Sequence, residues 1–353
     1  MGSALTVIIA ILVFGFLIFI PEFGHYITAR IFKVTINEFS IGMGPRLVTY
    51  DSKKTKIKYS LAMLPIGGFV AMAGEDGANP ETADDPNTFD KKPAWQRFII
   101  TAAGAFVNIL AGFLAMILLT ALINIGDTKV AEFVPKEETG FDVSSEESGL
   151  LVGDEIIRVN GKRVKILDEL SYEIMRQGYK PVDLTVIRDG KETVLEDVVF
   201  PSMSEEEQTF GAMDFRVKRV EKNLGRVLGF SVRKSALIVR MCWESIYDLI
   251  TGRYTLAAVS GPVGISSAIG DAAAEGFTSL LYIVTLISIN LGVMNLLPIP
   301  ALDGGRILTI LIEMITGKKL PPRVEGMING IGLALLLLLS AVILVKDVFQ
   351  LIF

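Results

Sequence analysis

Apolar and polar residues along this chain fall into long separate blocks. Four apolar blocks are long enough, with their flanks, to cross the roughly 30 Å hydrocarbon core of a bilayer as helices. They cover residues 4–20, 98–125, 277–297 and 328–344. The pattern therefore predicts a polytopic α-helical membrane protein with about four transmembrane helices and soluble parts between them.

The first apolar block could be a cleaved signal peptide or a retained transmembrane helix. It lacks a basic leader, and no small-residue cleavage site precedes Glu22. We therefore interpret residues 1–28 as the first transmembrane helix.

Residues 29–97 form a polar region with ten lysines and arginines, an excess that marks a cytoplasmic loop. Within it, residues 35–45 and 56–62 have strand character, and residues 64–70 carry turn chemistry. We expect a β-hairpin region here, followed by an acidic, proline-bearing linker over residues 75–93.

Residues 128–200 have the composition of a soluble α+β domain inserted between transmembrane helices. Asn160 and Gly161 lie between strand-like runs and give a strong hairpin-turn signal. A helix is predicted over residues 168–175 and a further strand over residues 182–188.

Residues 201–275 are predicted to be a linker that contains an amphipathic helix. Between residues 224 and 254, basic side chains recur among apolar residues at helical intervals. Such a helix could lie in the membrane interface or pack against the preceding domain, and the sequence leaves both open. Residues 276–353 then hold the third and fourth transmembrane helices.

The basic side chains beyond the third apolar block indicate which side of the membrane it reaches. Arg306, Lys318, Lys319 and Arg323 lie there, so this end is predicted to be cytoplasmic. Four crossings then place both chain ends and the inserted domain outside the cell, as expected for a multi-pass protein of a bacterial cytoplasmic membrane.

The composition narrows the classes of partner. Hydrophobic residues make up 51% of the chain and charged residues 21%, with a net charge of −5, which argues against a nucleic-acid partner. The single cysteine excludes an intrachain disulfide and a multi-cysteine metal site.

Two ionisable side chains, Glu22 and His25, stand at the end of the first apolar block. Charge inside a transmembrane segment is costly and usually marks a functional site. The two residues have the spacing of the second and fifth places of H-E-x-x-H, in which two histidines bind zinc and the glutamate is the general base. Pro21 occupies the first place and has no lone pair for a metal. A glutamate and a histidine that merely end a helix at the membrane surface are the alternative.

A second polar group interrupts the apolar residues far downstream. Pro298 and Pro300 break regular helix there, which at membrane depth is tolerated where the backbone is buried in protein or lines a cavity. Asp303 follows, and the predicted topology places it at the same depth as His25.

These residues carry a specific resemblance. Residues 22–25 match the tail of the H-E-F-G-H motif of the bacterial site-2 proteases, and residues 295–304 match the N-x-x-P-x-P-x-L-D-G motif of the same family. The similarity covers nearly the whole chain. Within the family, the chain resembles the type that has one PDZ domain and regulates sigma factors.

The resemblance implies a zinc metalloendopeptidase that hydrolyses peptide bonds of single-span membrane substrates, such as anti-sigma factors, within or near the bilayer. Position 21, His25 and Asp303 would bind Zn²⁺, and Glu22 would take a proton from the zinc-bound water. Pro21 cannot serve as a ligand, which is the main departure from the family pattern.

The resemblance also assigns supporting and substrate-binding roles. The supporting residues would be Asn108, Asn295, Pro298, Pro300 and Gly304. Gly67, Gly68 and Phe69, in the membrane-associated β-hairpin, would hold an extended substrate beside the metal. Asn108 could instead join helices, and Ala105 departs from the usual G-P-x-x-N pattern. The domain of residues 128–200 resembles a circularly permuted PDZ domain, which could bind peptides or exclude bulky substrates.

Pro21 separates two hypotheses about function. In the first, the chain is a zinc protease whose first ligand has been replaced or is compensated by Glu22, Asn295 or an extra water. In the second, it is a catalytically inactive homologue that binds membrane proteins without cleaving them. A transporter with broken helices is a third alternative, but it leaves the PDZ-like domain unexplained.

Overall fold

The computed structural model describes residues 3–75, 84–135, 144–205, 208–253 and 259–352. Two compact units make up the chain. The membrane unit comprises Met1–Met116 and Ile238–Phe353, and the sheet unit comprises Ile117–Leu237.

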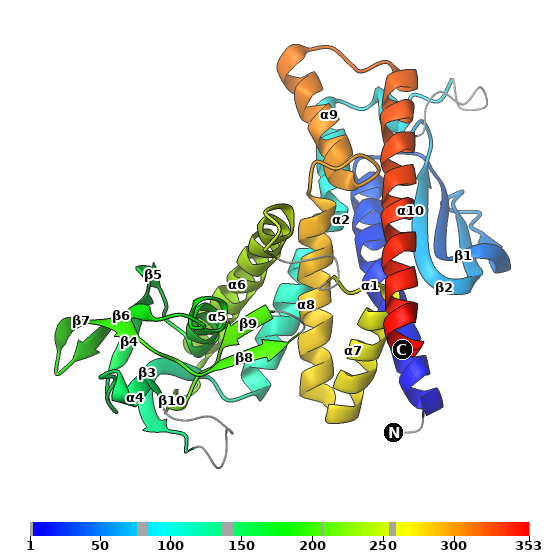
Figure 1. The fold of residues 1–353 in the computed structure, drawn as a ribbon. Coiled ribbons are helices and arrows are strands. Elements are labelled where there is room, and N and C mark those ends of the chain that lie inside the picture. The colour runs from blue at the N-terminus through cyan, green and yellow to red at the C-terminus, as the bar shows by residue number, and fades with distance from the viewer. Residues whose placement is uncertain (1–2, 76–83, 136–143, 206–207, 254–258, 353) are drawn as a thin grey trace. The chain divides into compact units, whose positions relative to one another are not determined.

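The membrane unit is built mainly from helices (Figure 1). In chain order they are α1 (Ser3–Ile31), α2 (Ala94–Leu122), α7 (Pro262–Glu275), α8 (Phe277–Asn295), α9 (Asp303–Thr316) and α10 (Pro322–Ile352). Within the described ranges, four helices are long and apolar enough to cross a membrane, namely α1, α2, α8 and α10. The prediction of about four transmembrane helices is confirmed.

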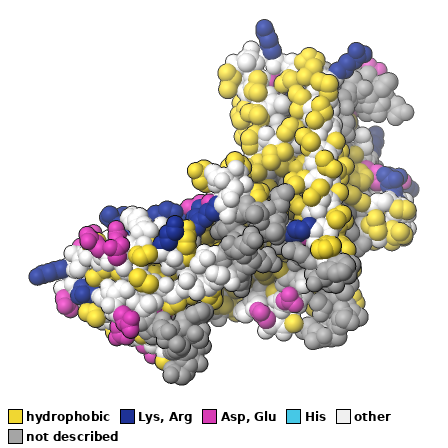
Figure 2. Space-filling model, viewed as in Figure 1, with side chains coloured by type: hydrophobic (Ala, Val, Ile, Leu, Met, Phe, Trp, Pro, Cys, Tyr) yellow, Lys and Arg dark blue, Asp and Glu magenta, His cyan; other side chains and the backbone are white. Residues whose placement is uncertain are grey.

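Helix α10 presents an apolar surface outward. In Figure 2, hydrophobic side chains cover the visible face over this helix. Large exposed side chains on α10 include Leu333, Leu335 and Leu338. A soluble monomer rarely exposes so extended an apolar surface, whereas lipid tails are as apolar as leucine. The surface of α10 therefore suits contact with lipid.

Helix α1 continues through Pro21 without a break. Proline lacks the N–H that would bond the carbonyl of Leu17, so the helix loses one hydrogen bond there. Close packing supports this part of α1, because a Cβ on Gly24 would lie only 2.6 Å from the carbonyl oxygen of Ala103 on α2. The helix is therefore held against its neighbour across the proline.

Strands β1 (Ile36–Asp51) and β2 (Lys58–Met72) form a two-stranded antiparallel sheet that packs on α1. Residues 64–70 belong to β2, so the prediction of a turn there is wrong. Two glycines make the strands irregular instead, one within that segment and one in β1. Gly42 and Gly67 have φ angles of 87° and 91°, a conformation that glycine adopts at little cost.

The irregular register lets the two strands pair in three stretches. Residues 36–41 pair with residues 68–72, residues 38–41 also pair with residues 58–61, and residues 46–51 pair with residues 58–62. The first of these pairings lies over a small core that it shares with α1 and α2. Buried members of that core are Ala29, Val34, Ile36, Phe39, Ile57, Val70, Met72, Phe89 and Ile100.

The predicted linker after β2 is only partly visible, because residues 76–83 lie outside the described residues. Its later part contains a short 3-10 helix, η2 (Phe89–Lys91). The buried ring of Phe89 joins the core under the sheet. This segment is therefore packed against the membrane unit rather than extended away from it.

Helix α9 was not predicted. The third transmembrane segment was predicted to end near residue 297, with Asp303 just beyond it and no helix of its own there, whereas α8 ends at Asn295 and a separate helix begins at Asp303. Pro298 and Pro300 explain the interruption, because neither can donate a backbone hydrogen bond. Residues 307–312 then resume an apolar pattern with helical spacing.

The sheet unit is an antiparallel sheet with one main helix. Its strand order is β10-β3-β4-β6-β7, with β5 paired to β4. The strands are β3 (Gly126–Phe133), β4 (Glu155–Val159), β5 (Lys162–Arg163), β6 (Val182–Arg188), β7 (Lys191–Val198) and β10 (Phe215–Arg219), and a short pair is β8 (Ser202–Glu205) and β9 (Gln208–Gly211). The helices are α4 (Ser144–Glu147) and α5 (Leu167–Gln177), and α6 (Leu224–Ile250) begins in this unit.

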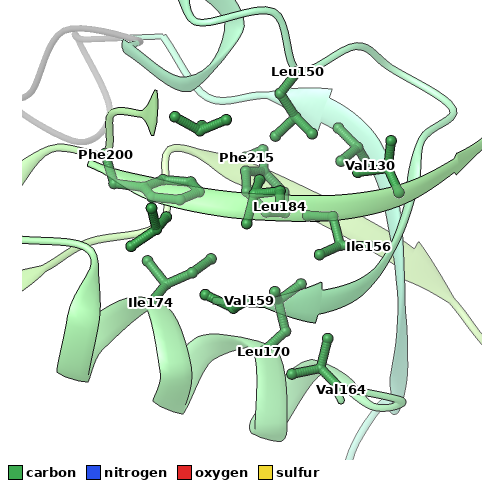
Figure 3. Close-up of a cluster of buried hydrophobic side chains, with 13 residues drawn as sticks. Val130, Leu150, Ile156, Val159, Val164, Leu170, Ile174, Leu184, Phe200 and Phe215 are labelled. Carbon is green, nitrogen blue, oxygen red and sulfur yellow. The ribbon is translucent and has the colours of Figure 1, made fainter. Parts of the chain in front are cut away.

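Several local predictions for this unit are confirmed. The predicted helix and strand correspond to α5 and β6. Asn160 and Gly161 turn the chain from β4 into β5 with φ angles of 45° and 76°, as a two-residue hairpin requires. The interior between sheet and α5 is apolar, with Ile156, Leu170 and Leu184 fully buried (Figure 3).

The unit extends beyond its predicted end at residue 200, because β10 pairs with β3 and completes the sheet. Residues 201–275 are therefore not a linker, since they contain strands β8 to β10 and helices α6 and α7. The resemblance to a PDZ domain stays a prediction.

The first half of α6 packs against α5 through charged side chains. Lys234 Nζ lies 2.9 Å from Asp168 Oδ1, and Arg233 Nη1 lies 3.6 Å from Glu169 Oε1. Of the two interpretations of the amphipathic helix, packing against the inserted domain is the one that these contacts support.

A buried ion pair closes the loop between α4 and β4. Both oxygens of Asp154, whose side chain is fully buried, accept hydrogen bonds from Arg188 at 2.7 and 2.8 Å. Burial acts to raise the pKa of Asp154, but the hydrogen bonds from Arg188 and from the Leu151 N–H outweigh it and hold the pKa below its usual range.

Arg188→Ala is therefore expected to destabilise the sheet unit by about 3 kcal/mol at neutral pH, because Asp154 would stay buried without its partner. A lowered folded-state pKa gives stability that is present above about pH 4 and is lost as the pH falls through the folded value. The difference between the parent and the variant should shrink below about pH 4. Urea titration of the full chain, read by hydrogen exchange of β4 and β6, measures it.

Arg163→Ala, which removes an exposed arginine of β5, is the matched control and should change stability little. Equal losses in the two variants would contradict a special role for the Asp154–Arg188 pair.

Candidate functional site

His25 is fixed from two sides inside the membrane unit. Its Nδ1 atom donates a hydrogen bond to the carbonyl oxygen of Ile100 on α2 at 2.9 Å. The Nε2 atom on the other side of the ring lies 3.3 Å from Oδ2 of Asp303. The structure thus brings together two predicted ligands that are far apart in the chain.

Helix α2 offers one face to His25. Ile100, Gly104 and Asn108 recur every four residues and so lie along the same side of the helix. A Cβ on Gly104 would lie 2.2 Å from Nε2 of His25, which leaves room only for glycine. Sequence analysis missed this role of Gly104, although a glycine within an apolar helix signals close approach.

Asn108 lies one turn beyond Gly104 and is fully buried. Its backbone carbonyl accepts a hydrogen bond from the Ser288 hydroxyl of α8 at 2.8 Å. Within the described part of the chain, neither polar atom of its side chain has a hydrogen-bond partner. The hydrogen bond to Ser288 of α8 is therefore made by the backbone of Asn108 and not by its side chain.

Asp303 owes its place to the break between α8 and α9. It is the first residue of α9, where the positive end of the helix dipole stabilises an anionic side chain. Ala301 precedes it with a left-handed φ of 73°. Gly304 follows, and a Cβ there would lie 2.0 Å from the carbonyl oxygen of Leu297. The loop therefore folds directly over the start of α9.

The other residues of the downstream motif shape this loop. Asn295 ends α8, and Pro298 is exposed. Pro300 packs on α10, where a Cβ on Gly332 would lie 2.5 Å from its Cβ. These residues position the segment that leads to Asp303.

Glu22 lies between the metal-ligand candidates and β2. It interacts electrostatically with His25 and Asp303, and also with the backbone of Val70. A Cβ on Gly68 would lie 3.5 Å from Cγ of Glu22 and 2.9 Å from the carbonyl oxygen of Ser40. Since Gly68 is buried there, the strand containing Gly67, Gly68 and Phe69 runs directly past the carboxylate.

The donor set can be compared with a zinc centre. Two ligand atoms about 2.0–2.1 Å from a tetrahedral zinc ion are roughly 3.3–3.4 Å apart. The distance between His25 Nε2 and Asp303 Oδ2 has this value. The Ile100 carbonyl holds the Nδ1–H tautomer, which leaves Nε2 free to ligate.

The third ligand position of a catalytic zinc centre has no metal-binding side chain here. Pro21 lies one turn before His25 on the same face of α1, and its ring has no lone pair. Among the described residues, no group of three His, Cys, Asp or Glu side chains could hold a metal ion. The residues present therefore fit two ligand positions of a catalytic zinc centre and not the three that such centres use.

The sequence did not indicate the roles of two residues near the site. Glu75 was assigned to the linker and Arg306 to the topological charge count, yet they form an ion pair in the membrane unit. A buried partner for either charge could not be deduced from its neighbours in the sequence.

Comparison with known proteins gives a consistent result. The model of peptidase family M50 matches residues 9–339. A protein of Fusobacterium nucleatum, named as a candidate zinc metalloprotease, is 35% identical over 98% of this chain and 99% of its own. Zinc metalloprotease RasP of Geobacillus kaustophilus is 29% identical, with 97% of each chain covered. Regulator of sigma-W protease RasP of Bacillus subtilis is 26% identical over 97% of this chain and 98% of its own.

The family match spans most of the chain, and the two motifs that define the site meet in the structure as such an enzyme requires. The chain therefore belongs to peptidase family M50, the site-2 protease family.

Proposed function

We propose that this chain is a zinc metallopeptidase scaffold that acts on single-span proteins within the bilayer, and that Pro21 leaves its metal centre incomplete. The observation that carries the proposal is the meeting of Glu22, His25 and Asp303 beside β2. The names of the relatives, which describe zinc metalloproteases, support the choice of metal.

His25 and Asp303 are the residues that would hold Zn²⁺. A bound zinc ion supplies a water of lowered pKa and polarises the carbonyl of a peptide bond. With two protein ligands the ion is held more weakly than with three, so we expect the chain to contain little zinc at ordinary concentrations.

The other residues prepare the site for peptide hydrolysis. The Ile100 carbonyl orients the imidazole of His25. Glu22, next to both ligand candidates, is placed to accept a proton from water and to pass it to the leaving amine. Glu22 and His25 are partly buried in the bundle, and reduced contact with water strengthens electrostatic contacts of this kind.

The substrate is proposed to lie along β2. A strand edge offers unpaired N–H and C=O groups, with which a locally unwound transmembrane segment can pair. Gly68 lets this strand lie against Glu22, because a Cβ there would already be 3.5 Å from Cγ of Glu22. Single-span proteins such as anti-sigma factors fit this geometry, and the name of the Bacillus relative mentions sigma-W.

A second candidate function is favoured by Pro21 itself. An inactive homologue could use the same strand to bind a transmembrane segment without cleaving it. The two candidates differ in whether histidine at position 21 restores metal binding and proteolysis.

We propose that the protein lies in the bacterial cytoplasmic membrane. Its site would lie near the cytoplasmic side, and its PDZ-like sheet unit would lie outside. That unit would act as a filter against substrates with bulky external domains, or would bind their peptides.

Pro21→His is expected to raise the zinc content from well below one to near one ion per chain. Loss of a partner outside the ligand shell already costs about 10–100-fold in affinity, so a restored ligand should gain more than about 100-fold. Metal analysis of both proteins purified in detergent, by inductively coupled plasma mass spectrometry, measures it.

If the parent chain already holds one zinc ion, another group completes the shell and the proposed defect is wrong. If neither protein binds zinc, the metallopeptidase assignment is wrong for this chain, and the binding function is favoured.

In the Pro21→His background, Asp303→Ala should abolish cleavage of a single-span reporter, because it removes a proposed ligand whose Oδ2 lies 3.3 Å from Nε2 of His25. Asp271→Ala, on an exposed position of α7, is the matched control and should cleave normally. Cleavage that survives Asp303→Ala would exclude this residue from the site.

Topology can be tested in a Cys242→Ser background. A cysteine at Lys54, in the exposed turn between β1 and β2, should react with impermeant reagents only from the cytoplasm, because basic loops stay inside. A cysteine at Asn160 should react only from outside. The reverse labelling pattern would overturn the proposed orientation.

A further inference from the structure

Arg306 makes three contacts from the first turn of α9. Its guanidinium forms an ion pair with the Glu75 carboxylate, and Nη2 donates to the Glu75 backbone carbonyl at 3.4 Å. The same group lies 5.7 Å from the centre of the Phe89 ring. Phe89 belongs to the core under the sheet, so Arg306 connects α9 to a rigid part of the membrane unit.

The ion pair is largely shielded from water. The side chains of Arg306 and Glu75 are 21% and 19% exposed. Exposed ion pairs contribute little, whereas removing one partner of a shielded pair leaves a charge without compensation. The Arg306–Glu75 pair is therefore expected to contribute to stability.

Each partner lies next to a component of the site. Arg306 follows Asp303 by three residues and shares its side of α9. Glu75 comes three residues after the end of β2 and interacts electrostatically with Glu22. The ion pair thus joins the helix that supplies a ligand to the strand that passes the general base.

The Arg306–Glu75 pair lies beside a cavity. A cavity of about 420 Å³ separates α9 from the segment after β2, and Glu75, Phe89 and Arg306 help to line it. On its cavity side this end of α9 has few van der Waals contacts, so Arg306 supplies its link to the segment after β2.

A second ion pair lines the same cavity and provides a control. Arg97 Nη2 lies 2.5 Å from Glu313 Oε1, and the two side chains are 10% and 14% exposed. Glu313 is also on α9, but it lies ten residues beyond Asp303. The two pairs share chemistry and burial and differ in their distance from the site.

We propose that Arg306 is a positioning residue, which through Glu75 keeps Asp303 in place relative to His25 and Glu22. The part that concerns metal binding rests on the proposed function. The coupling between α9 and β2 does not, because it follows from the contacts alone.

The first test uses the chain as it is and needs no metal. In Arg306→Ala, amide hydrogen exchange of residues 70–75 and 303–306 should rise about tenfold, the effect of losing a hydrogen bond to a charged group. In Arg97→Ala these segments should change less than about twofold, while exchange rises around residue 313. Equal exchange in both variants at residues 70–75 and 303–306 would overturn the proposal.

The second test measures zinc affinity in the Pro21→His background, by competition with a chelator. Arg306→Ala should weaken zinc binding by about 10–100-fold, and Arg97→Ala should leave it within about threefold at a similar loss of thermal stability. Weakening of the same size in both would assign Arg306 a merely structural role.

Arg306→Lys is a conservative control for the case in which the alanine variant misfolds. It keeps the charge but loses the paired N–H groups, so its zinc affinity and exchange should fall between those of the parent and the alanine variant. Parent-like values in Arg306→Lys together with a folded, parent-like Arg306→Ala would contradict the proposal. If Pro21→His binds no zinc, the proposed function fails, and hydrogen exchange alone decides the role of Arg306.

Discussion

The contact between His25 and Asp303 ties α1 to α9 inside an otherwise apolar helical unit. An isolated charge in such surroundings is costly, so a carboxylate and an imidazole there must be paired, hydrogen-bonded or bound to a metal. The Ile100 carbonyl satisfies the second nitrogen of the ring. Much of the local structure can be understood as the means of bringing these polar groups together.

Glycines make that meeting sterically feasible. Gly24 lets α1 approach α2, and Gly104 leaves room for the imidazole of His25. Gly68 lets β2 pass beside Glu22, and Gly304 lets the loop fold over the start of α9. Because membrane helices associate through close packing rather than through water exclusion, residues without side chains are where the polar site can be built.

In the function that we propose, Pro21 takes away a metal ligand and leaves the architecture of the site intact. Helix α1 runs through it, and Glu22, His25 and Asp303 keep positions that suit a metallopeptidase. The scaffold and the metal shell are therefore separable properties. Packing of α1 against α2 and β2 fixes the scaffold, whereas the proposed metal shell would depend on the side chain at position 21.

Arg306 and Glu75 form a further polar contact at the edge of the site. A cavity lies between part of α9 and the segment after β2, and the Arg306–Glu75 ion pair connects the two beside it. The sheet unit uses a comparable device, since Arg188 compensates the buried Asp154. In both places, one arginine compensates a carboxylate that is shielded from water.

The sequence by itself determined the transmembrane helices and the family. Long apolar blocks predict helices because every backbone group must be satisfied inside lipid, and the two motifs are local strings of residues. It also predicted α5, β6 and the turn at Asn160, all of which depend on short-range preferences. Only the tertiary structure decided the contact of His25 with Asp303, the strand at residues 64–70, helix α9 and the Arg306–Glu75 pair. These depend on groups distant in the chain, whose meeting is set by packing and charge compensation rather than by neighbouring residues.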